Sequence, residues 1–126
     1  YVDVKVDIMA KFPQGEVAYL SGGFNHYYQS KYSVWTDNMK LELTRAYAVP
    51  PTFKTKITLD KDDQISDFEI DKIDQFGLMF NSFHDVLKGK AKIFNFESDI
   101  IEQARFMEAV RTSHKEKRLV KVSDIR

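Results

Sequence analysis

The chain has 126 residues, of which 43% are hydrophobic and 30% charged, so it has the size and composition of one globular domain. Its 19 basic and 19 acidic residues cancel, which argues against nucleic acid and anionic membranes as partners. The absence of cysteine excludes disulfide scaffolds, thiolate metal sites and cysteine nucleophiles, and no apolar run approaches the ~18 residues of a membrane span. We therefore expect a cytoplasmic protein. The chain begins at Tyr1, directly before a strong strand pattern, and this abrupt start suggests a piece of a longer protein.

The first half of the chain has the two-residue periodicity of β-strands. Apolar and polar side chains alternate over residues 2–12, and Pro13-Gln14-Gly15 supplies a turn before a returning strand at residues 16–24. Turn-forming residues separate four further predicted strands: Tyr27–Thr36, Leu41–Tyr47, Phe53–Leu59 and Ile65–Ile70. Proline interrupts the pairing at Pro50-Pro51, because it cannot donate to a strand ladder.

The second half changes to the 3.6-residue period of helices. One apolar stripe, which predicts a helix that Gly89 ends, consists of Ile73, Phe76, Phe80, Phe83 and Leu87. A second helix is predicted with Ser98 as its N-cap, followed by a last strand over Arg118–Val122. Strands followed by helices favour an α+β fold, in which one open, mainly antiparallel sheet of about six strands carries two helices packed on one face. We expect residues 1–126 to form a single domain.

Several patterns that resemble functional motifs are better explained by structure. His26, His84 and His114 lie far apart in sequence, without a second metal ligand at the usual spacing. The acidic segment at residues 60–64 starts like a calcium loop but has Ile65 where glycine is required, so a hairpin turn is expected. Ser21-Gly22-Gly23 lacks the spacing of a phosphate-binding loop, and a bulge or a close backbone approach explains the glycines. No metal site and no catalytic residue is predicted.

The predicted sheet has one uncovered face, and polar and aromatic side chains on it suggest a ligand or a second subunit. Candidate substrate-binding residues on two adjacent strands are Tyr28, Lys31, Arg45 and Tyr47, because such groups commonly hold polyhydroxylated ligands. Gln75 joins them, since the start of a helix offers free N–H groups. The alternative is that these residues form ordinary cross-strand pairs.

Motifs along nearly the whole chain, about residues 2–123, resemble those of one enzyme family. The matching segments are Phe12-Pro13-Gln14-Gly15-Glu16-Val17-Ala18 with Gly23-Phe24, Leu41-Glu42-Leu43-Thr44-Arg45-Ala46-Tyr47 with Pro50, Asp74-Gln75-Phe76 with Phe83 and Gly89, and Gln103-Ala104 with Ser113, Val120 and Val122. Together they resemble the C-terminal domain of the Gfo/Idh/MocA oxidoreductases, the glucose–fructose oxidoreductase and inositol dehydrogenase group. The chain departs from that family at Trp35-Thr36-Asp37-Asn38, where the family usually has a G-T-x-G turn.

The resemblance implies the C-terminal domain of an NAD(P)-dependent oxidoreductase that acts on a sugar, cyclitol or nucleotide-sugar. It implies a substrate pocket shared with an N-terminal Rossmann domain, and a homo-oligomer formed through the open sheet face. The dinucleotide fingerprint and the family's catalytic motifs are missing here, so no catalytic residue is carried over. NAD or NADP is expected in the full-length protein only, and the isolated chain is predicted to be inactive. The alternative function is a stand-alone carbohydrate-binding or dimerisation module.

Overall fold

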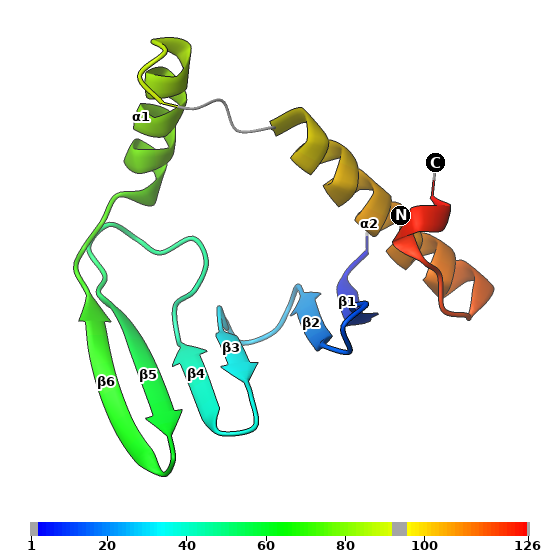
Figure 1. Ribbon diagram of the computed structural model, residues 1–126, viewed down its shortest axis with the longest axis horizontal. Coiled ribbons are helices and arrows are strands. Elements are labelled where there is room, and N and C mark those ends of the chain that lie inside the picture. The colour runs from blue at the N-terminus through cyan, green and yellow to red at the C-terminus, as the bar shows by residue number, and fades with distance from the viewer. Residues whose placement is uncertain (1–2, 92–95, 126) are drawn as a thin grey trace. The chain divides into compact units, whose positions relative to one another are not determined.

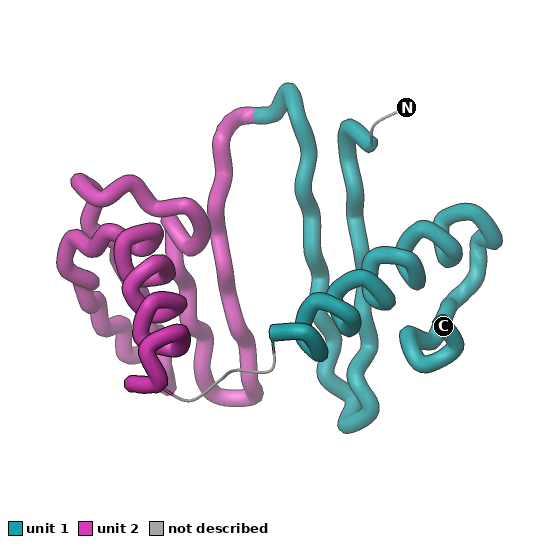
Figure 2. Tube along the Cα trace, turned by 90° about the horizontal axis from the view of Figure 1, so that it is seen from above, with its two compact units in different colours: residues 1–26, 93–126 teal, residues 27–92 magenta. Residues whose placement is uncertain are grey.

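A computed structural model describes residues 3–91 and 96–125 of the chain. In these described residues, six strands, two α-helices and one short 3-10 helix follow one another in chain order (Figure 1). They fall into two compact units, one made of residues 1–26 and 93–126 and the other of residues 27–92 (Figure 2). The predicted α+β class, with six antiparallel strands and two helices, is confirmed. Within the described residues, no helix is long and apolar enough to cross a membrane.

The first unit begins with the predicted hairpin. Strands β1 (Lys5–Lys11) and β2 (Val17–Gly23) pair antiparallel, with Gly15 in the turn at a φ of 105°. The register places Ile8 opposite Leu20 on the apolar side, as the alternation predicts. A Cβ atom on Gly23 would lie 3.2 Å from the Val4 carbonyl oxygen, so this glycine permits the close backbone approach expected of it.

The other half of the first unit is helical and differs from the prediction at both ends. Helix α2 (Phe96–Glu116) already includes Ser98, so the expectation that Ser98 is its N-cap was wrong. The predicted last strand was also wrong, because the segment ends in a 3-10 helix, η1 (Val122–Asp124). The physical reason lies at the end of α2, where Ser113 Oγ donates a 2.7 Å hydrogen bond to the Arg118 carbonyl. This bond folds the chain back, and no strand of the described residues pairs with it.

The second unit contains a four-stranded antiparallel sheet in the order β3-β4-β5-β6. Its strands are β3 (Tyr32–Trp35), β4 (Met39–Leu43), β5 (Thr55–Lys61) and β6 (Gln64–Ile70). Hydrogen bonds therefore group the six strands into two sheets, where the sequence suggested one. The strand predicted from Tyr27 begins only at Tyr32, after a left-handed residue at Asn25, which has a φ of 61°.

The four-stranded sheet has one charged and one apolar face, because paired residues project to the same side. Across the charged face the register aligns Ser33, Glu42, Thr58 and Asp67. Across the apolar face it aligns Tyr32, Leu43, Ile57 and Phe68. The leucine and the isoleucine of the two central strands are half-buried, whereas the residues of the two edge strands are exposed.

The turn between β5 and β6 is a two-residue hairpin, as predicted for this acidic segment. Asp62 and Asp63 have φ angles of 52° and 61° and lie between the paired residues Lys61 and Gln64. Both residues are therefore left-handed, a conformation that glycine adopts without the steric cost of a Cβ atom.

Replacing Asp63 with glycine is expected to raise the free energy of unfolding by about 0.5–1 kcal/mol, because it relieves this steric cost. Urea denaturation measures the change. The matched control is Asp60→Gly, in strand β5 without a left-handed φ, which should instead destabilise the protein. Equal effects of both variants would contradict the assignment of the turn.

Helix α1 (Gln75–Leu87) begins at an aspartate cap. The Asp74 carboxylate accepts hydrogen bonds from the backbone N–H groups of Phe76 and Gly77 at 3.1 and 3.0 Å. The helix ends before Gly89, which has a φ of 67°, as predicted. Its apolar stripe is exposed in the structure, up to 70% at Leu87, so the expected burial of this stripe against the sheet is not observed.

Replacing Asp74 with alanine is expected to lower the free energy of unfolding by about 1 kcal/mol, because two N–H groups lose their acceptor. Urea denaturation followed by circular dichroism measures the loss. Asp71→Ala is the control, since Asp71 is an exposed aspartate just before the helix and caps nothing. A loss no larger than that of the control would contradict the capping role.

Candidate functional site

The candidate substrate-binding residues all lie in the second unit, and most of them gather where the segment between β4 and β5 passes the residues before β3. Ser30 forms an isolated bridge with Arg45, and the Ala46 N–H donates to the Ser30 carbonyl at 2.9 Å. This pairing brings Tyr28 and Arg45 together although sixteen residues lie between them in the sequence. The sequence predicted that they lie on adjacent strands but not that they touch.

Two buried hydroxyl groups hold this segment in place. Ser30, only 8% exposed, donates its hydroxyl hydrogen to the Tyr47 carbonyl at 3.0 Å and accepts from the Tyr47 N–H at 2.9 Å. Thr55, 6% exposed, donates to the Arg45 carbonyl at 3.1 Å. Both hydroxyl groups therefore replace the strand ladder that ends at Leu43, and they satisfy backbone groups that would otherwise lack a partner.

The side chain of Arg45 is half-buried and lies over two aromatic rings. Its Cζ atom is 4.6 Å from the centroid of the Tyr28 ring and 5.2 Å from that of Phe53. Both rings are themselves partly exposed, Tyr28 by 55% and Phe53 by 40%. Such cation–π contacts stabilise the guanidinium by about 0.5–2 kcal/mol and restrict its rotamers. We call these five residues, Tyr28, Ser30, Arg45, Phe53 and Thr55, the Arg45 cluster.

Tyr47 and Gln75 are both connected to the chain segment that carries Arg45. The backbone of Tyr47 is fixed by Ser30, whereas its side chain is exposed. The amide of Gln75 donates a 3.3 Å hydrogen bond to the Val49 carbonyl, which connects the start of α1 to the same segment. Between them Ala48 adopts a left-handed φ of 47°, which is unusual for a residue other than glycine. The segment that carries Arg45 thus also carries the exposed Tyr47 ring and holds the Gln75 amide through the Val49 carbonyl.

Lys31 is engaged elsewhere, on the charged face of the sheet. Its ammonium forms an ion pair with Glu42, which also pairs with Lys40. Hydrogen bonds from Lys31 and then Lys40 hold the pKa of the Glu42 carboxyl below its ordinary value of 4.5. Among the predicted substrate-binding residues, Lys31 is therefore the one whose charge is already paired with a carboxylate.

Because folding lowers the pKa of Glu42, the free energy of unfolding depends on pH in the acidic range. Glu42 remains ionised to a lower pH in the folded than in the unfolded state, so its stabilising contribution is present above pH 4.5 and is lost as pH falls through the lowered pKa. We expect the urea midpoint of Glu42→Gln to fall less steeply than that of wild type below about pH 5. Glu16→Gln, an exposed glutamate at the β1–β2 turn, is the control. Parallel profiles for all three proteins would contradict the role of Glu42.

The sequence analysis missed three members of the Arg45 cluster. Ser30 and Thr55 have no sequence signal that separates them from exposed strand residues, because their burial depends on the returning segment. Phe53 was assigned only to a strand, and it precedes β5 in the structure. Alternation left the face of Arg45 ambiguous, since this arginine shares the parity of Leu41 and Leu43, which lie on the apolar face.

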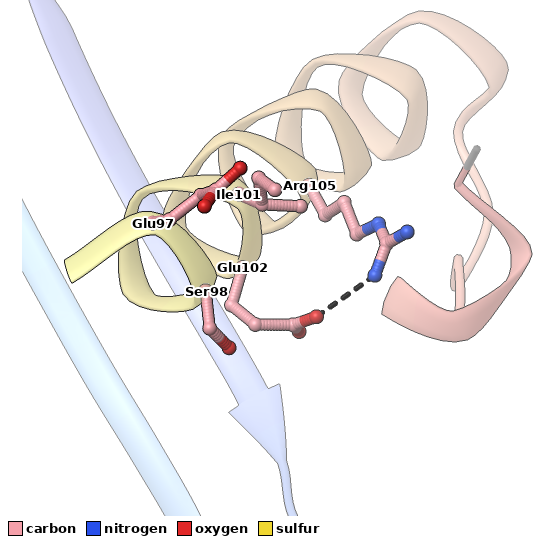
Figure 3. A pocket seen from close by; sticks show the side chains of 5 residues that line it. All are labelled: Glu97, Ser98, Ile101, Glu102 and Arg105. Atoms are coloured by element: carbon pink, nitrogen blue, oxygen red, sulfur yellow. Dashed lines mark hydrogen bonds and ion pairs between the residues drawn. The ribbon is translucent and has the colours of Figure 1, made fainter. Parts of the chain in front are cut away.

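Other parts of the described chain offer less. A shallow surface pocket follows the first turns of α2 and is lined by Glu97, Ser98, Ile101, Glu102 and Arg105 (Figure 3). Arg105 donates a 2.8 Å hydrogen bond to Glu102 there, so the charges of these two side chains neutralise each other. Among residues 3–91 and 96–125, no three His, Asp or Glu side chains are placed to hold a metal ion.

Comparisons of the sequence with known proteins find distant relatives that share one activity name. No protein-family model matches the chain. The chain is 26% identical over 110 residues to dTDP-3,4-didehydro-2,6-dideoxy-alpha-D-glucose 3-reductase of Streptomyces antibioticus, covering 86% of this chain and 34% of that protein. The enzyme of the same name from Actinomadura kijaniata is 25% identical over 99 residues, covering 79% of this chain and 30% of that protein. The chain thus spans about a third of the length of these relatives, in their C-terminal portion.

A solved structure shares the fold. It is a crystal structure of a point mutant of KijD10, a 3-ketoreductase from Actinomadura kijaniata, in complex with TDP-benzene and NADP. The match has a TM-score of 0.79 at 24% identity and covers 86% of this chain and 35% of that one. The architecture of this chain therefore occurs as part of a larger protein that binds a nucleotide ligand and NADP.

Proposed function

We propose that this chain forms the substrate-binding part of an NAD(P)-dependent oxidoreductase that acts on a sugar-like substrate, with a nucleotide-sugar as the favoured class. The observation that carries the proposal is the match of 86% of the chain to dTDP-sugar 3-reductases, supported by the shared fold. In this proposal the chain is a C-terminal domain of the Gfo/Idh/MocA type, whose motifs it resembles. NAD or NADP then binds to the Rossmann domain of the whole protein.

The Arg45 cluster with its neighbours is the proposed substrate surface. Tyr28 and Tyr47 present exposed rings and hydroxyls, and Gln75 an amide, which are the group types that bind sugar hydroxyls. The buried Ser30 and Thr55 would keep this surface rigid, which lowers the entropy cost of binding. Lys31, which pairs with Glu42 on the charged face, lies outside this proposed surface.

Binding of TDP-glucose and of NADPH to the chain, measured by isothermal titration calorimetry, tests the proposal. The expected result is measurable binding of TDP-glucose and none of NADPH, because the phosphate-cradling turn of a dinucleotide site is missing from this sequence. Stoichiometric binding of NADPH would overturn the proposal that the cofactor binds to the Rossmann domain and not to this chain. Binding of neither ligand would overturn the assignment of substrate binding to this chain.

A homo-oligomer through the open face of the sheet is part of the same proposal. Exposed apolar side chains on that face include Tyr32 and Val34 on one edge strand and Phe68 and Ile70 on the other, and exposed apolar surface can mark an interface. Sedimentation velocity of the chain should then show dimers or larger species at high concentration. A monomer throughout would instead assign this face to the ligand or to the cofactor domain.

A further inference from the structure

Arg45 differs from the other arginines that the structure describes. The guanidinium groups of Arg105, Arg111 and Arg118 each lie within 4 Å of a glutamate on their own segment, at 2.8, 3.7 and 2.6 Å. Arg45 forms no ion pair with any carboxylate of residues 3–91 and 96–125, and none of these residues accepts a hydrogen bond from its side chain. Its contacts are the two aromatic rings instead. A half-buried cation is thus held in place without a counter-charge.

No hydrogen bond or ion pair with the described residues uses the N–H donors of the Arg45 guanidinium. Arginine has five N–H donors in the plane of the group, whereas contacts with aromatic rings use the charge of the group and not these donors. The Tyr28 and Phe53 rings limit the rotamers of the side chain, so less conformational entropy is lost when a ligand binds. The hydrogen bond from Thr55 to the Arg45 carbonyl fixes the backbone beneath it.

Partial burial increases what such a group contributes to binding. A charge-assisted hydrogen bond strengthens as the surrounding dielectric falls, and Arg45 is half-buried beside aromatic side chains. A planar guanidinium matches the two oxygens of a phosphoryl or carboxylate group better than it matches a sugar hydroxyl. Of the common ligand groups, an oxyanion therefore fits the unpaired guanidinium of Arg45 best.

We propose that Arg45 is a specificity-determining residue that binds an oxyanion, phosphoryl or carboxylate, of the sugar-like substrate. The inference rests on the proposed function and adds which residue binds the anionic part of the substrate. Tyr28 and Phe53 act as positioning residues, because they orient the guanidinium and leave its donors to the ligand. Neutral sugars lack the group that Arg45 recognises, so they bind weakly at this site.

The first test compares ligands on the wild-type chain by calorimetry. The probes are TDP, glucose 1-phosphate, glucuronate, glucose and inorganic phosphate. We expect the anionic sugars or TDP to bind at least tenfold more tightly than glucose. TDP and glucose 1-phosphate report phosphoryl recognition and glucuronate reports carboxylate recognition, which distinguishes the two sources of the oxyanion. Equal affinity for glucose and its phosphate would overturn the inference while leaving sugar binding intact.

The second test removes the guanidinium. Arg45→Gln should weaken binding of the preferred anion by about 10- to 100-fold, the value of a charged hydrogen bond of roughly 1.5–3 kcal/mol. Arg45→Lys keeps the charge and loses the planar fork, so an intermediate loss is expected. Arg111→Gln, which removes the same charge from the exposed side of α2, is the matched control and should change affinity less than twofold.

Three results would contradict the role of Arg45. Unchanged anion affinity in Arg45→Gln would show that the guanidinium only packs against its rings. Equal losses in Arg45→Gln and Arg111→Gln would indicate a general charge effect. Binding of none of the probes by the wild-type chain would overturn the proposed function together with this inference, and far-ultraviolet circular dichroism of each variant identifies losses caused by unfolding.

Discussion

Replacing Ser30 with alanine is expected to lower the free energy of unfolding by about 1–3 kcal/mol, the largest loss among the substitutions considered. The Ser30 hydroxyl both donates to the Tyr47 carbonyl and accepts from the Tyr47 N–H. Alanine removes both bonds at a site that is 8% exposed, where water has little access. A buried backbone N–H without a partner then carries its full desolvation cost.

Urea denaturation of Ser30→Ala measures this loss. Ser66→Ala is the matched control, because Ser66 lies on β6 of the same sheet and is exposed. Its effect should stay within about 0.5 kcal/mol. If Ser30→Ala also stays within that range, a water molecule or a rearranged segment satisfies Tyr47, and the serine does not hold the segment.

Replacing Thr55 with valine is expected to cost about 1–2 kcal/mol, because the Arg45 carbonyl loses its hydrogen-bond donor inside the sheet. Valine keeps the shape and the β-branching, so strand propensity and packing change little. The control is Thr58→Val, on the same strand, because the Thr58 hydroxyl donates to the exposed Asp67 carboxylate. This substitution should lower the free energy of unfolding by less than half as much. A loss equal to that of the control would contradict the structural role of the Thr55 hydroxyl.

The double variant Ser30→Ala with Thr55→Val tests whether the two hydroxyls act on one segment. Ser30 holds Tyr47 and Thr55 holds Arg45, only two residues away. Once the first substitution loosens the segment, the second has less left to disrupt, so the double loss should be smaller than the sum by about 0.5 kcal/mol or more. Strict additivity would show that the two hydroxyls act independently.

Most secondary structure could be predicted because it depends on local patterns. The alternation over residues 2–12 and the turn at Gly15 define the first hairpin, and the acidic residues before Ile65 define the last one. Two errors of assignment lie at the ends of α2. Ser98 has the chemistry of an N-cap yet lies inside the helix, and Arg118–Val122 has the pattern of a strand but lacks a partner. A strand pattern shows preference only, since a strand exists through its neighbour.

The candidate site was predictable in part. Polarity and spacing singled out Tyr28 and Arg45, which the structure brings into contact. Lys31 had the same kind of signal, but Glu42 pairs with it across the charged face. The distances between strands decide which basic side chains lack an acidic partner. The composition, with equal numbers of acidic and basic residues, does not identify these side chains.

The sequence by itself determined the α+β class, the hairpins and the helix over Gln75–Leu87, because periodicity, turn residues and caps act within a few residues of each other. The tertiary structure alone decided that the strands form two sheets and that Ser30 and Thr55 are buried. It also decided that Arg45 lies over the Tyr28 and Phe53 rings without a carboxylate. These features arise when segments 8 to 25 residues apart meet, and the hydrogen bonds and ring contacts formed there have no local signal in the chain.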